Sequence, residues 1–337
     1  MPKISVIIPL YNTRPYVERC ITSLLQQSFS DFEAIFVDDA STDGCAAVVR
    51  QSARNDARIV LKTHDRNKGP GAARNTGIAS ARASYVTFVD SDDYVTPDLL
   101  DCMIRASDKG HYDIVEIGCQ AVDHAGNILW DYIPEPMRVE KLGSDPEDIF
   151  LIREWGMTQK LWRRSLFQSD TRFPEGLYWE DIAVVPALTV DARNLVKVDF
   201  VGYNYLQHPA SITNTRSVKH VLDLFRAFDY FKAHLRKRGI LDRFGATLAR
   251  VVKSRAEYFI GHMRANNPTE KSDMLIRLCQ MLVEGSLKGV PVVKSFTEEE
   301  FRAMVAMAQN NATPIGTGSE QGLGHPLDRA AEDHHGA

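Results

Sequence analysis

The stretch Phe88-Val89-Asp90-Ser91-Asp92-Asp93 decides how this 337-residue chain is interpreted. Residues 85–89 are all β-branched or aromatic, which is typical of a buried strand. Three carboxylates follow within the next four residues. So much negative charge at the tip of a strand is unfavourable unless a positive group balances it. A divalent metal ion that carries a phosphorylated ligand is the simplest such group.

The composition is that of an ordinary soluble globular protein, with 44% hydrophobic and 25% charged residues. A net charge of −4 argues against bulk binding of nucleic acid. The five cysteines are scattered, without a CxxC pair, which indicates free thiols in a reducing compartment. The chain opens without a signal-peptide pattern, and no apolar stretch is long enough to span a membrane. We therefore expect a cytoplasmic protein.

Strand-like and helix-like segments alternate through the first 120 residues. The predicted strands are 4–8, which Pro9 closes, then 32–37, 59–61, 85–89 and 113–119. The predicted helices are 17–25, a second through 46–49 with N-caps in 41–43, a third over 72–81, and a fourth with Pro97 at its first position. This alternation predicts an α/β fold with a mostly parallel sheet covered by helices on both faces.

Polar loops follow three of these strands. They are Tyr11-Asn12, Asp38-Asp39 and Asp90-Ser91-Asp92-Asp93. Ligands of parallel sheets bind outside the carboxyl ends of the strands, where these loops converge. A capped turn explains any one of them, Asp38-Asp39 in particular, but the three together predict a binding crevice.

Four segments of the first hundred residues resemble the family 2 inverting glycosyltransferases. They are 6–12, 37–44, the pattern Asn67-x-Gly69-x-x-x-Ala73-Arg74-Asn75-x-Gly77, and the DxD-type motif at 90–93. Their order and spacing carry the resemblance. It implies a GT-A (Rossmann-like) nucleotide-sugar fold. The third segment lacks the Gly-Lys-Ser/Thr of a P-loop and is not GxGxxG, so a nicotinamide cofactor is not indicated.

The resemblance implies a donor site for a UDP-sugar. Tyr11 would stack on the uracil ring, and Asp39 would accept a hydrogen bond from the edge of the base. Pro9 and Ser91 would line the same nucleotide-sugar site. Arg74 would supply a fixed cation near the phosphates, although a surface arginine on a helix explains it as well.

The resemblance also implies a metal site. Asp92 would be the main ligand of Mn²⁺ or Mg²⁺, with Asp90 on the ribose or metal side and Asp93 as a neighbour. The ion would bridge the carboxylate and the two phosphates, and would offset the charge that grows on the leaving diphosphate.

The stretch 172–182 resembles the family segment that carries the catalytic base. Asp181 fits the base, which removes a proton from the acceptor hydroxyl. Glu180 would orient Asp181 or bind the acceptor. The alternative is an acidic pair favoured by the dipole of a helix over 182–188. Tyr178 and Trp179 would form a stacking platform for the acceptor sugar, or else pack in the core.

The region after residue 120 is less regular. We expect a hairpin around 125–127, a helical segment at 147–154 and a final strand at 198–205. The segment 205–213 has Leu206 and Ala210 where the family often has Arg and Gly, which puts a diphosphate contact from an arginine in doubt. His208 and Ser211 are candidates for part of that role, and His208 also for the acceptor site.

We divide the chain into a GT-A domain at 1–215, a helical C-terminal region at 216–309 and a disordered tail at 310–337. The GT-A domain consists of a nucleotide-sugar half at 1–120 and an acceptor half at 121–215. The helical region begins with an apolar stripe of Val221, Leu222, Phe225, Phe228, Phe231 and Leu235, and further helices are predicted at 273–287 and 298–309. Its basic stretch at 232–255 is either a peripheral contact with the inner face of a membrane or a solvated basic face.

The leading hypothesis is a metal-dependent inverting transferase that moves a hexose from a UDP-sugar to a glycan or lipid-linked acceptor, in surface polysaccharide biosynthesis. A sugar-1-phosphate nucleotidyltransferase is an alternative. It should have a Gly-rich, Arg-containing loop after the first strand, whereas this chain has Pro9-Leu10-Tyr11-Asn12 there. A non-catalytic nucleotide-sugar binder is another, but it should have lost the DxD motif or the base. Without spanning helices or a Gln-x-x-Arg-Trp-type motif, the chain is interpreted as adding single sugars.

Overall fold

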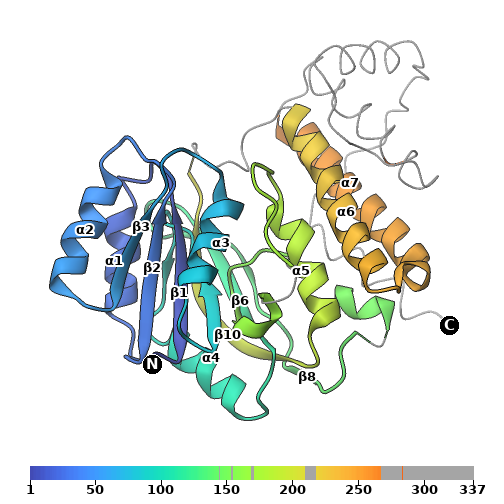
Figure 1. Ribbon diagram of the computed structural model, residues 1–337, viewed down its shortest axis with the longest axis horizontal. Helices are drawn as coiled ribbons and strands as arrows, with labels where there is room; N and C mark the ends of the chain where they lie inside the picture. Colours follow the sequence, from blue (N-terminus) through green and yellow to red (C-terminus); the bar gives the residue numbers. More distant parts are fainter. Residues whose placement is uncertain (144, 153–154, 168–170, 209–217, 267–282, 284–337) are drawn as a thin grey trace.

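The computed structural model describes residues 1–143, 145–152, 155–167, 171–208, 218–266 and 283 (Figure 1). The strands are β1 (Ile4–Leu10), β2 (Phe32–Asp38), β3 (Ile59–Thr63), β4 (Tyr85–Phe88), β5 (Tyr94–Val95), β6 (Ile114–Val122), β7 (Ile128–Tyr132), β8 (Met137–Val139), β9 (Lys160–Arg163) and β10 (Leu195–Leu206). The α-helices are α1 (Val17–Leu25), α2 (Cys45–Asn55), α3 (Pro70–Ser80), α4 (Leu99–Asp108), α5 (Glu180–Asp191), α6 (Val218–Lys237) and α7 (Gly245–Asn266). Short 3₁₀ helices are η1 (Pro146–Phe150), η2 (Arg164–Phe167) and η4 (Leu241–Phe244).

All the strands belong to one sheet with the order β3-β2-β1-β4-β9-β6-β10-β5, and β7 and β8 pair with β6 and β10. Neighbours among β3, β2, β1 and β4 are parallel, as are β6 and β10. β9 is antiparallel to both β4 and β6, so it joins two parallel groups that run in the same direction. The sheet is therefore mostly parallel, as predicted, and the loops after β1, β2, β4 and β10 emerge at one edge.

Proline 9 does not end the first strand, contrary to expectation. β1 continues to Leu10, and Pro9 pairs in register with Val37 of β2. Pairing of β1 with β4 stops at Ile7 and Phe88, so the missing N–H of Pro9 costs no hydrogen bond on that side.

The connecting segments differ from the expectations in detail. α4 begins at Leu99 with Asp98 as its N-cap, so Pro97 lies before the helix and not at its first position. The helical segment expected at 147–154 is confirmed in part, as the 3₁₀ helix η1 (Pro146–Phe150). β5 and β9 were not predicted, because two to four residues that pair with distant strands leave no βα pattern. The hairpin around 125–127 is confirmed by the antiparallel pairing of β6 with β7.

Helices cover both faces of the sheet with separate hydrophobic cores. One core contains side chains of α1, α2 and α4, and the other contains side chains of α3, α5 and α6. α5 is buried almost all round at residues 183–189, because it lies between the sheet and α6 (Figure 1).

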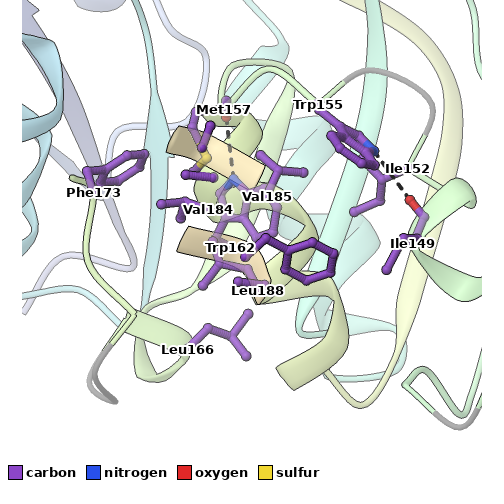
Figure 2. Close-up of a cluster of buried hydrophobic side chains, with 14 of the residues drawn as sticks. Ile149, Ile152, Trp155, Met157, Trp162, Leu166, Phe173, Val184, Val185 and Leu188 are labelled. Carbon is purple, nitrogen blue, oxygen red and sulfur yellow. Dashed lines mark hydrogen bonds between the residues drawn. The ribbon is translucent and has the colours of Figure 1, made fainter. Parts of the chain in front are cut away.

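The predicted apolar stripe of α6 is buried in the same core as α5. Figure 2 shows the part of this core that packs on α5, where the indole N–H groups of Trp155 and Trp162 donate to the carbonyls of Ile149 and Met157. The described part of the helical region therefore shares a core with the sheet. The helices predicted at 273–287 and 298–309 and the tail at 310–337 lie outside the described residues, apart from position 283.

Several charges of the basic stretch are engaged within the fold. The partners are Asp229 for Lys232, Asp191 for Arg238, Glu147 for Arg250 and the ring of Trp155 for Arg255. These contacts account for part of the charge of the stretch, and a peripheral contact with a membrane stays a prediction. No helix among the described residues has both the length and the apolar character to cross a bilayer.

The contact of α3 with β1 gives a test of this packing. A Cβ on Gly77 would lie 2.3 Å from Cγ2 of Ile7, a separation that side-chain carbons do not adopt. We expect Gly77→Ala to lower the free energy of unfolding by about 1–3 kcal/mol, the usual range for overpacking. Urea denaturation measures the difference. Gly245→Ala is the matched control, because a Cβ there meets no atom within 4 Å and the backbone is helical. Equal stability of the two variants would contradict the close packing.

Candidate functional site

The loops after β1 and β2 are bonded to each other at the carboxyl edge of the sheet. Asn12 has a left-handed backbone with φ of 52°, and its side chain accepts the N–H of Thr42 at 2.9 Å. The backbone N–H groups of Asn12 and Arg14 donate to the side chains of Ser41 and Asp43. Next to this junction Tyr11 is 49% exposed, a large ring that remains accessible for the predicted stacking on a base.

Asp39 is buried and already bonded within the protein. One carboxylate oxygen pairs with Nδ1 of His64 at 2.6 Å, and the other accepts the N–H of Gly69 at 2.7 Å, while the N–H of Lys68 reaches both. His64 in turn bonds the Thr76 hydroxyl at 2.8 Å. Since a carboxylate offers about four acceptor positions, most of the capacity of Asp39 fixes the loop before α3.

Sequence reasoning did not select His64. The feature that could have identified His64 is its position directly after β3, at the same edge of the sheet as the other polar loops. It links the loop after β2 to α3 through Asp39 and Thr76.

The carboxylates of the DxD-type motif have different environments. Asp93 is buried, and it accepts the Tyr203 hydroxyl at 2.5 Å and the N–H of Leu206 at 2.8 Å. Burial, with Asp92 and Asp90 nearby, raises the pKa of Asp93 well above its usual value. Asp93 therefore fastens the end of β10 to the motif and is not open to a ligand.

Asp90 and Asp92 keep part of their side chains exposed, 35% and 25%. Asp92 pairs with Nε2 of His208 at 2.9 Å, which places His208 beside the motif. Ser91 accepts the hydroxyl of Thr13 from the loop after β1 at 2.9 Å. Burial raises the pKa of Asp90, against the lowering by Arg74, and Asp92 raises it further. Two partly exposed carboxylates so close together, Asp90 and Asp92, favour a bound cation.

Asp90 and Asp92 fit one kind of metal site. No group of three or more His, Cys, Asp or Glu side chains in the described parts of the chain is placed to hold a metal ion. Mg²⁺ is commonly bound by one or two carboxylates together with the phosphates of a substrate. Two partly exposed carboxylates suit an ion shared with a diphosphate, and not a cage built by the protein alone.

Arg74 joins the motif to a distant acid. Its buried guanidinium donates to Asp90 at 2.9 Å and to Glu180, which lies 106 residues further along the chain. We expected Arg74 to face the phosphates of the donor, but the structure shows it between two carboxylates. Since these engage Nη1 and Nη2, the guanidinium is held in place by the protein itself.

The start of α3 is shaped to bring the segment before α5 close. A Cβ on Gly71 would lie 2.6 Å from the carbonyl oxygen of Pro174, so only glycine allows this approach. The Asn75 amide donates to the carbonyl of Phe173 at 2.8 Å and accepts its N–H at 3.0 Å. The Gly-rich pattern of the third segment thus clamps the chain that leads to Glu180.

Glu180 and Asp181 form the first turn of α5 beside this arginine. Burial raises the pKa of Glu180 to about 7, although Arg74 lowers it. Burial also raises the pKa of Asp181, again against the effect of Arg74. An acid with raised proton affinity at the edge of such a cluster suits general base chemistry.

Tyr178 and Trp179 were expected to offer a stacking platform, and the structure gives them another role. The Tyr178 ring stacks on His220 with centroids 4.2 Å apart, and Nζ of Lys219 lies 4.5 Å from its centre. The Trp179 indole donates to the carbonyl of His220 at 2.9 Å. Both rings pack against α6, which is the alternative considered from the sequence. Ser211 lies outside the described residues.

The sequence model described as Glycosyl transferase family 2 matches residues 5–157. The succinoglycan biosynthesis protein ExoO of Rhizobium meliloti is 32% identical over 240 residues, which are 68% of this chain and 68% of that protein. This chain belongs to glycosyl transferase family 2.

Two further relatives are glycosyltransferases by name. The Bacillus subtilis glycosyltransferase EpsJ is 32% identical over 222 residues, 63% of each protein. A glycosyltransferase of Haemophilus influenzae is 36% identical over 127 residues, 38% of this chain and 51% of that protein. The chain therefore spans about half to two thirds of the length of the first curated relatives it matches.

A solved structure confirms the GT-A fold. The crystal structure of S. aureus TarS residues 1–349 in complex with UDP-GlcNAc matches with a TM-score of 0.65 and 23% identity. The match covers 91% of this family 2 chain and 87% of the other.

The position of Arg74 leads to a stability prediction. Removing one partner of a buried ion pair leaves an uncompensated charge, so we expect Arg74→Met to lower the free energy of unfolding by about 3–5 kcal/mol. Adding Glu180→Gln should recover part of this loss, since it removes the stranded acid. Arg105→Met is the control, because Arg105 is 75% exposed in its pair with Asp101. Chemical denaturation in which Arg74→Met and Arg105→Met behaved alike would contradict the buried bridge.

Proposed function

We propose that this family 2 member is a metal-dependent inverting glycosyltransferase. It moves a hexose from a UDP-sugar to a glycan or lipid-linked acceptor in surface polysaccharide biosynthesis. One observation carries the proposal: a single buried guanidinium joins Asp90 of the DxD-type motif to the acidic start of α5. Donor-side carboxylates and a candidate base thereby belong to one site, as direct displacement at a sugar carbon requires.

The donor side of the proposal consists of the loops after β1, β2 and β4. Tyr11 stacks on the base. Asp39 holds the loop before α3 and keeps limited capacity to accept a hydrogen bond from the edge of the base. Pro9 and Ser91 line the same nucleotide-sugar site. TarS structures that contain UDP and UDP-GlcNAc support a uridine nucleotide as the donor. Arg74 is proposed to position Asp90 and Glu180, the two acids that it bonds.

Asp92 and Asp90 would hold Mn²⁺ or Mg²⁺ together with the diphosphate. When bound, the ion supplies positive charge that stabilises the leaving UDP. His208 is bonded to Asp92, so it is proposed to orient this carboxylate and to take part in binding the diphosphate.

Asp181 is the proposed base. It takes the proton of the acceptor hydroxyl as this oxygen attacks the anomeric carbon from the face opposite the diphosphate. No covalent bond between enzyme and sugar forms. Because Glu180 is bonded to Arg74, it fixes the start of α5 and is not the group that accepts the proton.

Two variants separate the donor side from the base. Asp92→Ala should abolish the Mn²⁺-dependent gain in affinity for the UDP-sugar, since it removes the main ligand. Asp181→Asn should keep that affinity but lower the rate of transfer by about 10²–10⁴-fold, the range for loss of a general base. Isothermal calorimetry and a transfer assay measure the two effects, with the donor chosen by a thermal-shift screen of UDP-hexoses.

Each variant is the control for the other. Unchanged metal-dependent affinity in Asp92→Ala would refute its role as a ligand. Full transfer by Asp181→Asn would assign the proton transfer to another group.

A further inference from the structure

The N-terminus of α5 has an unusual backbone conformation. Its N-cap residue, Trp179, has φ of 63° and ψ of 32°, in the left-handed region, and no side chain caps the helix. A bulky residue in this region is strained, and the conformation persists only when its surroundings determine it. Since Asp181 lies two residues later, whatever holds Trp179 also sets the position of the proposed base.

The first turns of α6 hold this segment. The Trp179 indole donates to the carbonyl of His220 at 2.9 Å, and the N–H of Tyr178 donates to Asp223 at 3.0 Å. The ring of His220 lies against that of Tyr178 with an interplanar angle of 17°. Lys219 donates to the carbonyl of Gly176 at 2.6 Å. Side chain and backbone of the segment are both fixed from α6.

Asp223 is the centre of these contacts. Its side chain is fully buried, and its two oxygens are bonded to Lys219 and to Arg226, the latter at 2.9 Å. Its cationic partners are partly exposed, Lys219 by 46% and Arg226 by 30%, so these ion pairs contribute little net stability. Its charge-assisted bond to the N–H of Tyr178 is directional, and it holds the backbone one residue before the strained position.

We propose that Asp223 is a positioning residue for Asp181. Through Tyr178 and Trp179 it maintains the left-handed turn that starts α5, and so it sets where the carboxylate of Asp181 lies relative to the acceptor. The inference rests on the proposed function, and it makes α6 part of the catalytic apparatus. α6 and α5 both follow the part of the chain matched by the family model, residues 5–157.

Asp223→Ala removes the acceptor for Tyr178. A small misplacement of a catalytic group lowers rates by about 10²-fold, so we expect kcat to fall by about 10- to 100-fold. Affinity for the UDP-sugar should fall far less than kcat, because the donor loops lie on other elements and Arg74 keeps its bond to Asp90. Asp223→Asn keeps an oxygen that accepts the same N–H, and it should restore most of the rate. Circular dichroism at the assay temperature verifies that each variant is folded.

Two further variants complete the experiment. Asp229→Ala is the control on the same helix, since Asp229 pairs with Lys232, and its rate should equal that of the parent chain. Trp179→Phe keeps an aromatic ring but loses the bond to His220, so it should lower kcat several-fold without a change in donor affinity. If Asp223→Ala does not fold, Trp179→Phe still tests whether contacts with α6 position Asp181.

The outcomes separate the inference from the proposed function. No transfer by the parent chain would overturn the proposed function and this inference with it. Transfer by the parent chain together with an undiminished kcat in folded Asp223→Ala, or in Trp179→Phe, would overturn the inference alone. An equal loss of kcat and donor affinity would also overturn it, because that signature belongs to a general structural defect.

Discussion

The bridge from Arg74 to Asp90 and Glu180 is the interaction on which the site depends. It joins the loop after β4 to the start of α5, between acids that burial alone would force apart or protonate. The close approach at Gly71 and the clamp by Asn75 serve the same junction. Assembly of the candidate site is therefore part of folding, and loss of the arginine is expected to disturb both.

Residues of one motif have separate tasks in this arrangement. Asp93 accepts hydrogen bonds from Tyr203 and Leu206 and so anchors the motif to the end of β10. Asp90 and Asp92 remain partly exposed. The same division holds at α5, where Glu180 is bonded to Arg74 and Asp181 is proposed to act on the acceptor. In both segments the most buried acid builds the site, and a less buried neighbour is left for chemistry.

The sequence predicted what local pattern and strand order determine. The alternation of strands and helices predicted the parallel groups, and the polar loops after β1, β2 and β4 predicted the edge that carries the site. It did not predict β9, the partners of Arg74 or the packing of Tyr178 on His220, because these depend on contacts between residues far apart in the chain. His64 was overlooked because its partners become visible only when the loops after β2 and β3 lie side by side.

The central claim is direct displacement on the sugar, with Asp181 as the base and no covalent intermediate. The anomeric configuration of the first-formed product tests this claim most directly. NMR of the product, formed from a UDP-sugar of known configuration, should show the opposite configuration at the transferred carbon. A product with the configuration of the donor would contradict the account, because retention needs a second displacement or attack from the side of the leaving group.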